Sequence, residues 1–350
     1  MKNDFSPDYN RIIDAALNRP GPVPLYEHNI SSEVISAIIN KDMPALLEEG
    51  DDASLREYFS LYANFHISHG YDTYSFEGCI TELVQQAAGL MGQGTSLIKS
   101  EEDFNSWPWD ELPLRYFEKF EPMFKAIVET LPEGMKIVGG IGNGMFETMQ
   151  DFVPFTELCY LELDNPELFA KLWKKVERSF LTIWTRFLDK YSDIIAVGRF
   201  GDDLGFKAST LLKPDTIREF IIPAYKNIVE LVHSHDKPFL LHSCGAIFDV
   251  MDDIIKKTKI DAKHSNEDAI APMTRWLEDY GDLIGNFGGI DMDVLCRENE
   301  AGIRSYVTER YKELEHYPGT AIGSGNQIAD YVPPENFITM VETVRELRGF

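Results

Sequence analysis

The stretch Pro238-Phe-Leu-Leu-His-Ser-Cys-Gly245 contains the pattern that decides the fold of this chain. A short apolar run ends in His242 and Cys244, and a helical pattern follows from Ala246. Side chains two residues apart in a strand point to the same face, so the imidazole and the thiol are expected side by side. Nitrogen and sulfur ligands suit zinc. A core histidine beside an inert buried cysteine is the alternative.

The same unit, a short strand that ends in polar residues and leads into a helical pattern, occurs eight times. Strands that alternate with helices pair in parallel, and eight such units that close on themselves form a (β/α)₈ TIM-like barrel. A doubly wound open sheet ranks second, because no G-x-G-x-x-G motif follows the first strand. The expected strands are 23–28, 73–76, 135–141, 194–198, 238–245, 261–267, 283–287 and 320–323.

A single α/β domain over residues 1–350 accounts for this pattern. No low-complexity linker and no short internal repeat divides the chain. The barrel is expected to carry an elaborated N-terminal helical part, with a helical extension over about residues 1–20. Asn165-Pro166 and Pro333-Pro334 mark the starts of two later helices, since proline is favoured at the first helical position.

Charge and cysteine content narrow the classes of function. The formal net charge of −25 argues against partners such as nucleic acid or an anionic membrane surface and fits small molecules or proteins. The four cysteines form no C-x-x-C pair, so reduced thiols are expected. The N-terminus has no apolar signal segment, and no apolar stretch approaches the about 20 residues that span a bilayer. A cytoplasmic protein with no membrane partner is therefore expected.

Polar residues gather at the expected carboxyl ends of the strands, where barrels of this class carry their active sites. Asp202 and Asp203 point in different directions in extended chain, so one of the two is expected to reach the site. Capping of the next segment is the alternative for this pair. Gly288 and Gly289 are expected to serve close packing or a positive φ angle. The polar residues are Glu27, His28, Glu77, Asn143, Asp202, Asp203, His242, Cys244, His264, Asn266, Glu267, Asp291, Ser324 and Asn326.

Five motifs occur together in the second half of the chain: Gly201-Asp-Asp-Leu-Gly205, Lys213-Pro-Asp215, Leu241-His-Ser-Cys-Gly245, Gly288-Gly-Ile-Asp291 and Val332-Pro-Pro-Glu-Asn336. In this combination the chain resembles the uroporphyrinogen decarboxylase superfamily, and more closely its branch of cobalamin-dependent methyltransferases. The true porphyrinogen decarboxylases carry a basic Arg-Gln-Ala-Gly-Arg segment that binds substrate carboxylates. Residues 11–30 contain nothing like it, so decarboxylation of uroporphyrinogen is not expected.

The resemblance implies a zinc ion held by His242, by Cys244 and by a further cysteine after the last strand. Ser324 stands where that cysteine is expected, and a hydroxyl is a much poorer zinc ligand than a thiolate. The third ligand is therefore open among Glu77, Glu27, His28 and Asp203, with Glu77 as our choice. The alternative is that zinc binds weakly or not at all. A carboxylate makes the site harder and favours oxygen nucleophiles or leaving groups.

The resemblance further implies methyl transfer between a small methylated substrate and a corrinoid. The chain contains no D-x-H-x-x-G motif, so the corrinoid is expected on a partner protein. Aromatic-rich stretches at 71–76 and 104–109 suit a methoxylated aromatic substrate and an O-demethylase activity. His242, Asp202 and Asp203 are the expected catalytic residues. The expected substrate-binding residues are Glu27, His28, Glu77, Asn143, His264 and Asn326.

Two other functions remain open. A decarboxylase of a small organic acid would use the acidic residues without a metal. A non-catalytic binding protein on the same barrel is permitted by the missing third cysteine. Zinc content, reaction with cob(I)alamin and release of carbon dioxide distinguish the three.

Overall fold

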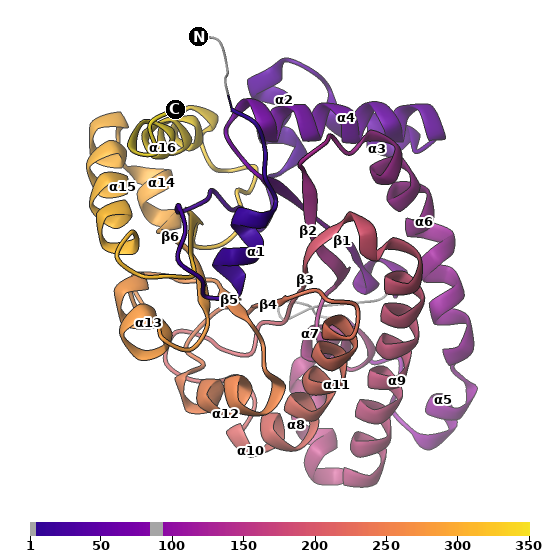
Figure 1. Cartoon of the computed structure of the whole chain (residues 1–350). Coiled ribbons are helices and arrows are strands. Elements are labelled where there is room, and N and C mark those ends of the chain that lie inside the picture. Colours follow the sequence, from indigo (N-terminus) through magenta and orange to yellow (C-terminus); the bar gives the residue numbers. More distant parts are fainter. Residues whose placement is uncertain (1–4, 85–93) are drawn as a thin grey trace.

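The computed structural model describes residues 5–84 and 94–350. These residues form a seven-stranded parallel sheet in which each strand pairs with its neighbours in the sequence, and the sheet curls into a TIM-like barrel (Figure 1). Because all strands run in one direction, their carboxyl ends meet at the same end of the barrel. The strands are β1 (Thr73–Cys79), β2 (Lys136–Gly142), β3 (Ile195–Gly201), β4 (Phe239–His242), β5 (Ala262–His264), β6 (Gly285–Ile290) and β7 (Thr320–Ser324).

The expected strand at 23–28 is not a regular strand, so the described sheet has seven strands rather than eight. This segment makes a single parallel bridge to β7, between Leu25 and Ile322. Pro22 and Pro24 lack a backbone N–H, which limits the ladder that the segment can form. On its other side, the Glu27 carbonyl accepts a hydrogen bond from the Ser75 hydroxyl on β1. Extended chain therefore lies between β7 and β1 and links them.

The helices begin at the signals that the sequence contains. Asn165 caps α9, because its side-chain oxygen accepts a hydrogen bond from Leu168 N at 3.1 Å, and Pro166 follows as the first helical residue. Pro334 is likewise the first residue of α16, although no side chain caps this helix. Among the described residues, no helix is long and apolar enough to cross a membrane.

The described residues form sixteen α-helices and four short 3₁₀ or π segments, and all the helices except α1 lie around the sheet (Figure 1). The helices before β2 are α1 (Asn10–Ala16), α2 (Ser32–Ile39), α3 (Met43–Glu49), α4 (Asp52–Ser68), α5 (Glu101–Ser106) and α6 (Leu112–Thr130). Those from β2 to β5 are α7 (Met145–Phe152), α8 (Phe155–Asp164), α9 (Pro166–Tyr191), α10 (Pro214–Thr216), α11 (Ile222–His233) and α12 (Phe248–Thr258). The remainder are α13 (Met273–Tyr280), α14 (Met292–Arg297), α15 (Glu300–Leu314) and α16 (Pro334–Leu347). The short segments are η1 (Ile80–Leu83), η2 (Trp109–Glu111), η3 (Ser192–Ile194) and η4 (Ile217–Ile221).

Helix α1 packs against the amino-terminal part of the barrel. Its buried residues Ile12, Ala15 and Ala16 form one apolar cluster with Tyr26 and with residues of six strands. In Figure 1, α1 lies in the middle of the ring of helices, in front of the strands. The backbone comes close at Gly285, where a Cβ atom would lie 2.4 Å from the Ala15 carbonyl oxygen. The strand residues of the cluster are Val138, Ala196, Val197, Leu240, Ala262, Phe287 and Ala321.

Strand β4 ends at His242, earlier than the sequence pattern predicts. Cys244 therefore belongs to the loop after the strand, and the period-two argument does not apply to it. The loop turns sharply because Gly245 adopts a φ of +82° and packs on Gly205, where a Cβ atom on Gly245 would lie 2.2 Å from the Gly205 carbonyl carbon. This turn keeps the thiol beside the imidazole.

Candidate functional site

Asp203, His242 and Cys244 converge at the carboxyl ends of β3 and β4. Cys244 Sγ lies 3.4 Å from His242 Nε2, and Asp203 Oδ1 lies 3.8 Å from the same nitrogen. Asp203 Oδ1 also accepts a hydrogen bond from Cys244 N at 2.9 Å. Around a tetrahedral zinc ion, oxygen and nitrogen ligands stand about 3.3 Å apart and sulfur and nitrogen about 3.6 Å apart. The spacing of the three ligand atoms therefore fits a zinc ion without a large rearrangement.

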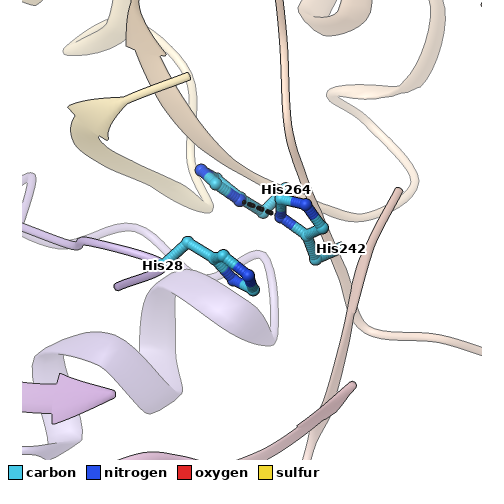
Figure 2. Close-up of side chains that lie close together, drawn as sticks. All are labelled: His28, His242 and His264. Carbon is cyan, nitrogen blue, oxygen red and sulfur yellow. Dashed lines mark hydrogen bonds between the residues drawn. The ribbon is translucent and has the colours of Figure 1, made fainter. Parts of the chain in front are cut away.

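His264 determines which nitrogen of His242 is free (Figure 2). His264 Nε2 lies 3.0 Å from the Ser324 carbonyl oxygen, which can only accept, so this nitrogen carries the proton. In the neutral ring, His264 Nδ1 then accepts from His242 Nδ1 at 2.7 Å. Burial lowers the pKa of His264 to about 3 and that of His242 well below its usual value. Both rings are neutral, and His242 Nε2 presents a lone pair to Cys244 and Asp203.

His28 lies next to both His242 and His264 (Figure 2). The rings of His28 and His242 stack with their centroids 3.8 Å apart and their planes at 16°. Three histidine nitrogens lie close enough for a metal group, but imidazole lone pairs lie in the ring plane, so stacked rings do not aim at one ion. The 2.7 Å between the Nδ1 atoms of His242 and His264 is also shorter than the spacing of two zinc ligands. The group of Asp203, His242 and Cys244 is the better candidate.

The Cys244 sulfur has two further polar neighbours. Ser265 Oγ and Asn326 Nδ2 each lie 3.3 Å from Sγ. Burial raises the pKa of the Cys244 thiol, and the nearby Asp203 carboxylate adds to this shift. Without a cation the sulfur is therefore protonated, and a bound metal would reverse this balance.

Asp202 faces away from this group. It is fully buried and accepts hydrogen bonds from Phe146 N, from Glu147 N at 2.9 Å and from the Tyr225 hydroxyl at 2.5 Å. These backbone N–H groups are the unpaired donors at the start of α7. Burial raises the pKa of Asp202 to about 6. Asp202 thus anchors a helix, and Asp203 is the one of the two carboxylates that reaches His242 and Cys244.

Glu147 is a site residue that the sequence interpretation missed. Its Oε1 accepts from Asp203 N at 3.1 Å, and its Oε2 accepts from Asn143 Nδ2 at 2.7 Å. Asn143 adopts a φ of +60° and accepts from the Thr81 hydroxyl at 2.9 Å. Burial, followed by the charges of Asp202 and Asp203, raises the pKa of Glu147 well above its usual value. An acidic residue in the first turn of a helix right after a strand was the available signal.

Glu77 does not join His242 and Cys244. Its carboxylate pairs with Arg199 Nε at 2.6 Å, and the Arg199 side chain is 2% exposed. Arg199 Nη1 also donates to the Tyr26 hydroxyl and the His28 carbonyl oxygen, both at 2.8 Å. A buried guanidinium requires a carboxylate nearby, so Glu77 is held by Arg199. Among the described residues, the carboxylate that lies beside His242 and Cys244 is that of Asp203, and not that of Glu77, which was our choice of third ligand.

Ser324 is bound to Glu27. Ser324 N donates to both oxygens of the buried Glu27 carboxyl at 3.2 Å, and the Ser324 hydroxyl contacts Glu27 Oε2 and the Asn326 carbonyl oxygen. Burial raises the pKa of Glu27 to about 8. A protonated Glu27 donates to Ser324 Oγ, which in turn donates to Asn326. The Ser324 hydroxyl, at the position of the expected third cysteine, therefore has hydrogen-bond partners in Glu27 and Asn326.

The six predicted substrate-binding residues thus line the same end of the barrel, but their described contacts are with other parts of the protein. Two of them support the candidate metal group directly, because His264 orients His242 and Asn326 contacts Cys244. Their roles toward a substrate remain predictions.

The parallel barrel and the polar side chains at its carboxyl ends define the class of protein, a TIM-like barrel with its candidate site in the loops that follow the strands. The sequence matches the family model of uroporphyrinogen decarboxylase (URO-D) over residues 95–347, and the chain belongs to this family. The resemblance to the uroporphyrinogen decarboxylase superfamily that the sequence motifs indicated is thereby confirmed.

Solved structures share the architecture. A methyltransferase from Methanosarcina mazei superposes with a TM-score of 0.74 at 15% identity, over 98% of this chain and 99% of that chain. A putative vitamin-B12 independent methionine synthase from Listeria monocytogenes superposes with a TM-score of 0.51 at 14% identity, over 94% and 97% of the two chains. No curated protein matches the sequence significantly. At these identities the likeness shows the fold.

Proposed function

We propose that this protein is a corrinoid-dependent methyltransferase that removes a methyl group from a small oxygen-linked substrate, such as a methoxylated aromatic. One observation carries the proposal: Asp203, His242 and Cys244 bring a carboxylate oxygen, an imidazole lone pair and a sulfur within 4.8 Å of one another. The membership of the URO-D family and the methyltransferase fold of a structural neighbour support it.

The donor set fits a zinc ion. Asp203, His242 and Cys244 would hold it, and the hydrogen bond from His242 Nδ1 to His264 keeps the Nε2 lone pair directed at the site. When bound, zinc supplies a Lewis acid that makes an oxygen leaving group better. One carboxylate in place of a second thiolate makes the set harder, which favours oxygen over sulfur substrates.

In the proposed reaction, the bond between the methyl carbon and the substrate oxygen breaks, and the methyl group moves to the cobalt of a reduced corrinoid on a partner protein. The oxygen leaves with the electron pair of the broken bond and takes up a proton to become a hydroxyl group. Asp203 and His242 would hold the zinc ion. Glu147 keeps Asp203 in place, because the Asp203 backbone N–H donates a hydrogen bond to Glu147 Oε1. A cytoplasmic location belongs to the same proposal.

The test combines metal analysis with a spectral assay. Purified protein is assayed for zinc and then mixed with cob(I)alamin and methoxylated aromatics, and formation of methylcobalamin is followed by absorbance. We expect about one zinc per chain and methyl transfer that is lost in Asp203→Asn. Asp252→Asn is the matched control, because within residues 5–84 and 94–350 the one ion pair of Asp252 is with Lys256 on the exposed face of α12.

Two results would contradict the proposal. Carbon dioxide release from small organic acids, without methyl transfer, would favour the decarboxylase. No reaction in either assay, together with an absence of zinc, would favour a binding protein.

A further inference from the structure

The sulfur of Cys244 is surrounded by hydrogen-bond donors as well as by the two other candidate ligands. Ser265 Oγ and Asn326 Nδ2 approach Sγ from the loops after β5 and β7, each at 3.3 Å. Sulfur hydrogen bonds are longer than those to oxygen, and both distances lie within their range. Two donors therefore reach one sulfur from two different strands.

The direction of both hydrogen bonds follows from the other contacts. Asn326 Oδ1 accepts from Gln327 N at 2.9 Å, which turns the amide so that its NH₂ group faces Cys244. Over residues 5–84 and 94–350, the Ser265 hydroxyl has Cys244 Sγ as its only hydrogen-bond partner. Asn326 and Ser265 thus both donate to the sulfur.

The backbone of Ser265 is strained. Its φ is +94°, whereas the other described non-glycine residues with positive φ lie between +53° and +64°. Such a conformation is costly for a residue with a Cβ atom and persists only where the surroundings impose it. Here the buried Lys263 ammonium binds the Ser265 carbonyl oxygen, and Asn266 N donates to the Gly325 carbonyl oxygen at 3.0 Å. Glycine would fit this backbone better, yet serine is present with its hydroxyl on the sulfur.

We propose that Ser265 and Asn326 are positioning residues that hydrogen-bond the metal-bound sulfur of Cys244, and so keep the metal acidic enough to activate an oxygen leaving group. This inference rests on the proposed function, because it assumes that Cys244 ligates a metal. Donors on a thiolate withdraw electron density from it, so the sulfur transfers less charge to the metal. The loop after β7 thus contributes no second thiolate ligand. It contributes the Asn326 amide, which donates a hydrogen bond to the Cys244 thiolate.

Cobalt(II) in place of zinc reports on the sulfur ligand, because charge transfer from a thiolate to cobalt(II) gives an absorption band in the near ultraviolet. The full chain, stripped of metal, is titrated with cobalt(II) as wild type, Ser265→Ala, Ser265→Gly and Asn326→Leu. We expect the band of each variant to move to longer wavelength, and cobalt affinity to fall by about tenfold. Asn326→Leu keeps the shape of the side chain and removes the donor without adding a charge, and the N–H of the exposed Gln327, which loses its acceptor, can bind water instead.

Two comparisons separate the hydrogen bond from folding. Ser265→Gly relieves the φ of +94° while Ser265→Ala keeps it, so equal shifts in the two variants identify the hydroxyl as the cause. Ser234→Ala is the matched control, since in the part of the chain that the structure describes the Ser234 hydroxyl makes hydrogen bonds only with Leu231 and His235, near the end of α11. Its band should coincide with that of the wild type.

The outcomes distinguish this inference from the proposed function. A wild-type protein that shows no charge-transfer band would overturn the metal site and the proposed function with it. A normal wild-type band that stays in place in the three variants would leave the metal site intact and overturn the roles of Ser265 and Asn326. A shift in Ser265→Gly alone would assign the effect to relief of the backbone strain and overturn them as well.

Discussion

Two groups of polar side chains share the carboxyl end of this barrel, and they use similar residues in opposite ways. The Arg199 group consists of Arg199, Glu77, Tyr26 and Ser75, and its donors and acceptors satisfy one another. The Cys244 group consists of Asp203, His242 and Cys244, and it leaves a nitrogen lone pair, a sulfur and a carboxylate facing one point. The Arg199 guanidinium pairs with the Glu77 carboxylate in the first group. In the second group, no described lysine or arginine forms an ion pair with Asp203, and the buried Lys263 acts on this carboxylate only at longer range.

This difference shows how to interpret a buried acid at a strand end. An acid that meets a buried arginine is part of the structure, since removing either partner leaves an unpaired charge. An acid that meets a neutral imidazole and a thiol lacks such a partner and is available to a metal ion. The same reasoning separates Glu77 from Asp203, which the sequence could not rank.

The largest expected effect is on the Cys244 group. Cys244→Ala or His242→Ala removes one of three ligands, so zinc affinity should fall by at least about 100-fold and methyl transfer should drop to background. Zinc content after dialysis and the cob(I)alamin assay measure this. Cys159→Ala, on α8, is the matched control and should keep its zinc. Full zinc occupancy in Cys244→Ala would remove Cys244 from the site.

The next effect concerns the Arg199 group and is on stability. Arg199→Met leaves the Glu77 carboxylate buried without a partner, so the free energy of unfolding should fall by about 3–5 kcal/mol, and Glu77→Gln/Arg199→Met should recover part of the loss. Denaturant titration gives these values. Zinc content should stay unchanged in Glu77→Gln. Loss of zinc in this single variant would restore Glu77 as the third ligand.

A pH-dependent effect is expected at Glu27, whose pKa rises from 4.5 to about 8 through burial. Between these values the unfolded chain has lost the proton and the native state has kept it, so stability falls as pH rises through this window. The change is at most roughly 5 kcal/mol. Glu27→Gln, which mimics the protonated acid, should be more stable than the wild type at pH 8.5 and similar to it at pH 5. Equal pH profiles in urea titrations would contradict the assignment.

The smallest effect is expected at Asp202. Asp202→Asn keeps one acceptor for the start of α7 and weakens the contact with Tyr225, so the free energy of unfolding should fall by about 1 kcal/mol. Methyl transfer should fall less than in Asp203→Asn. A larger loss of activity than in Asp203→Asn, with stability unchanged, would support the catalytic role predicted from the sequence.

Sequence periodicity was sufficient for most of the fold. Strand-helix alternation predicted the parallel barrel, and Asn165-Pro166 and Pro333-Pro334 predicted two helix starts. The count of eight regular strands was wrong for the described residues, because apolar alternation at 23–28 does not reveal how far two prolines restrict pairing. Gly288 and Gly289 were predicted to serve close packing or a positive φ angle, and both adopt a positive φ, whereas the positive φ of Ser265 was not predicted.

Part of the candidate site was also accessible from the sequence. His242 and Cys244 are near neighbours along the chain, so their proximity needs little tertiary information, although it is a loop and not a strand that brings them together. Arg199 and Glu147 were missed, since an arginine inside an apolar strand and an acid in a first helical turn have common explanations. Their partners, Glu77 and Asp203, lie 122 and 56 residues away.

The sequence by itself determined the local conformations and the end of the barrel at which polar groups collect. Both follow from periodicity and from the common direction of parallel strands. Only the tertiary structure decided that the Asp203 carboxylate lies beside His242 and Cys244 and that the Glu77 carboxylate pairs with Arg199. That choice depends on distances between loops of different strands and on the cost of burying an unpaired charge, and neither is a local property of the chain.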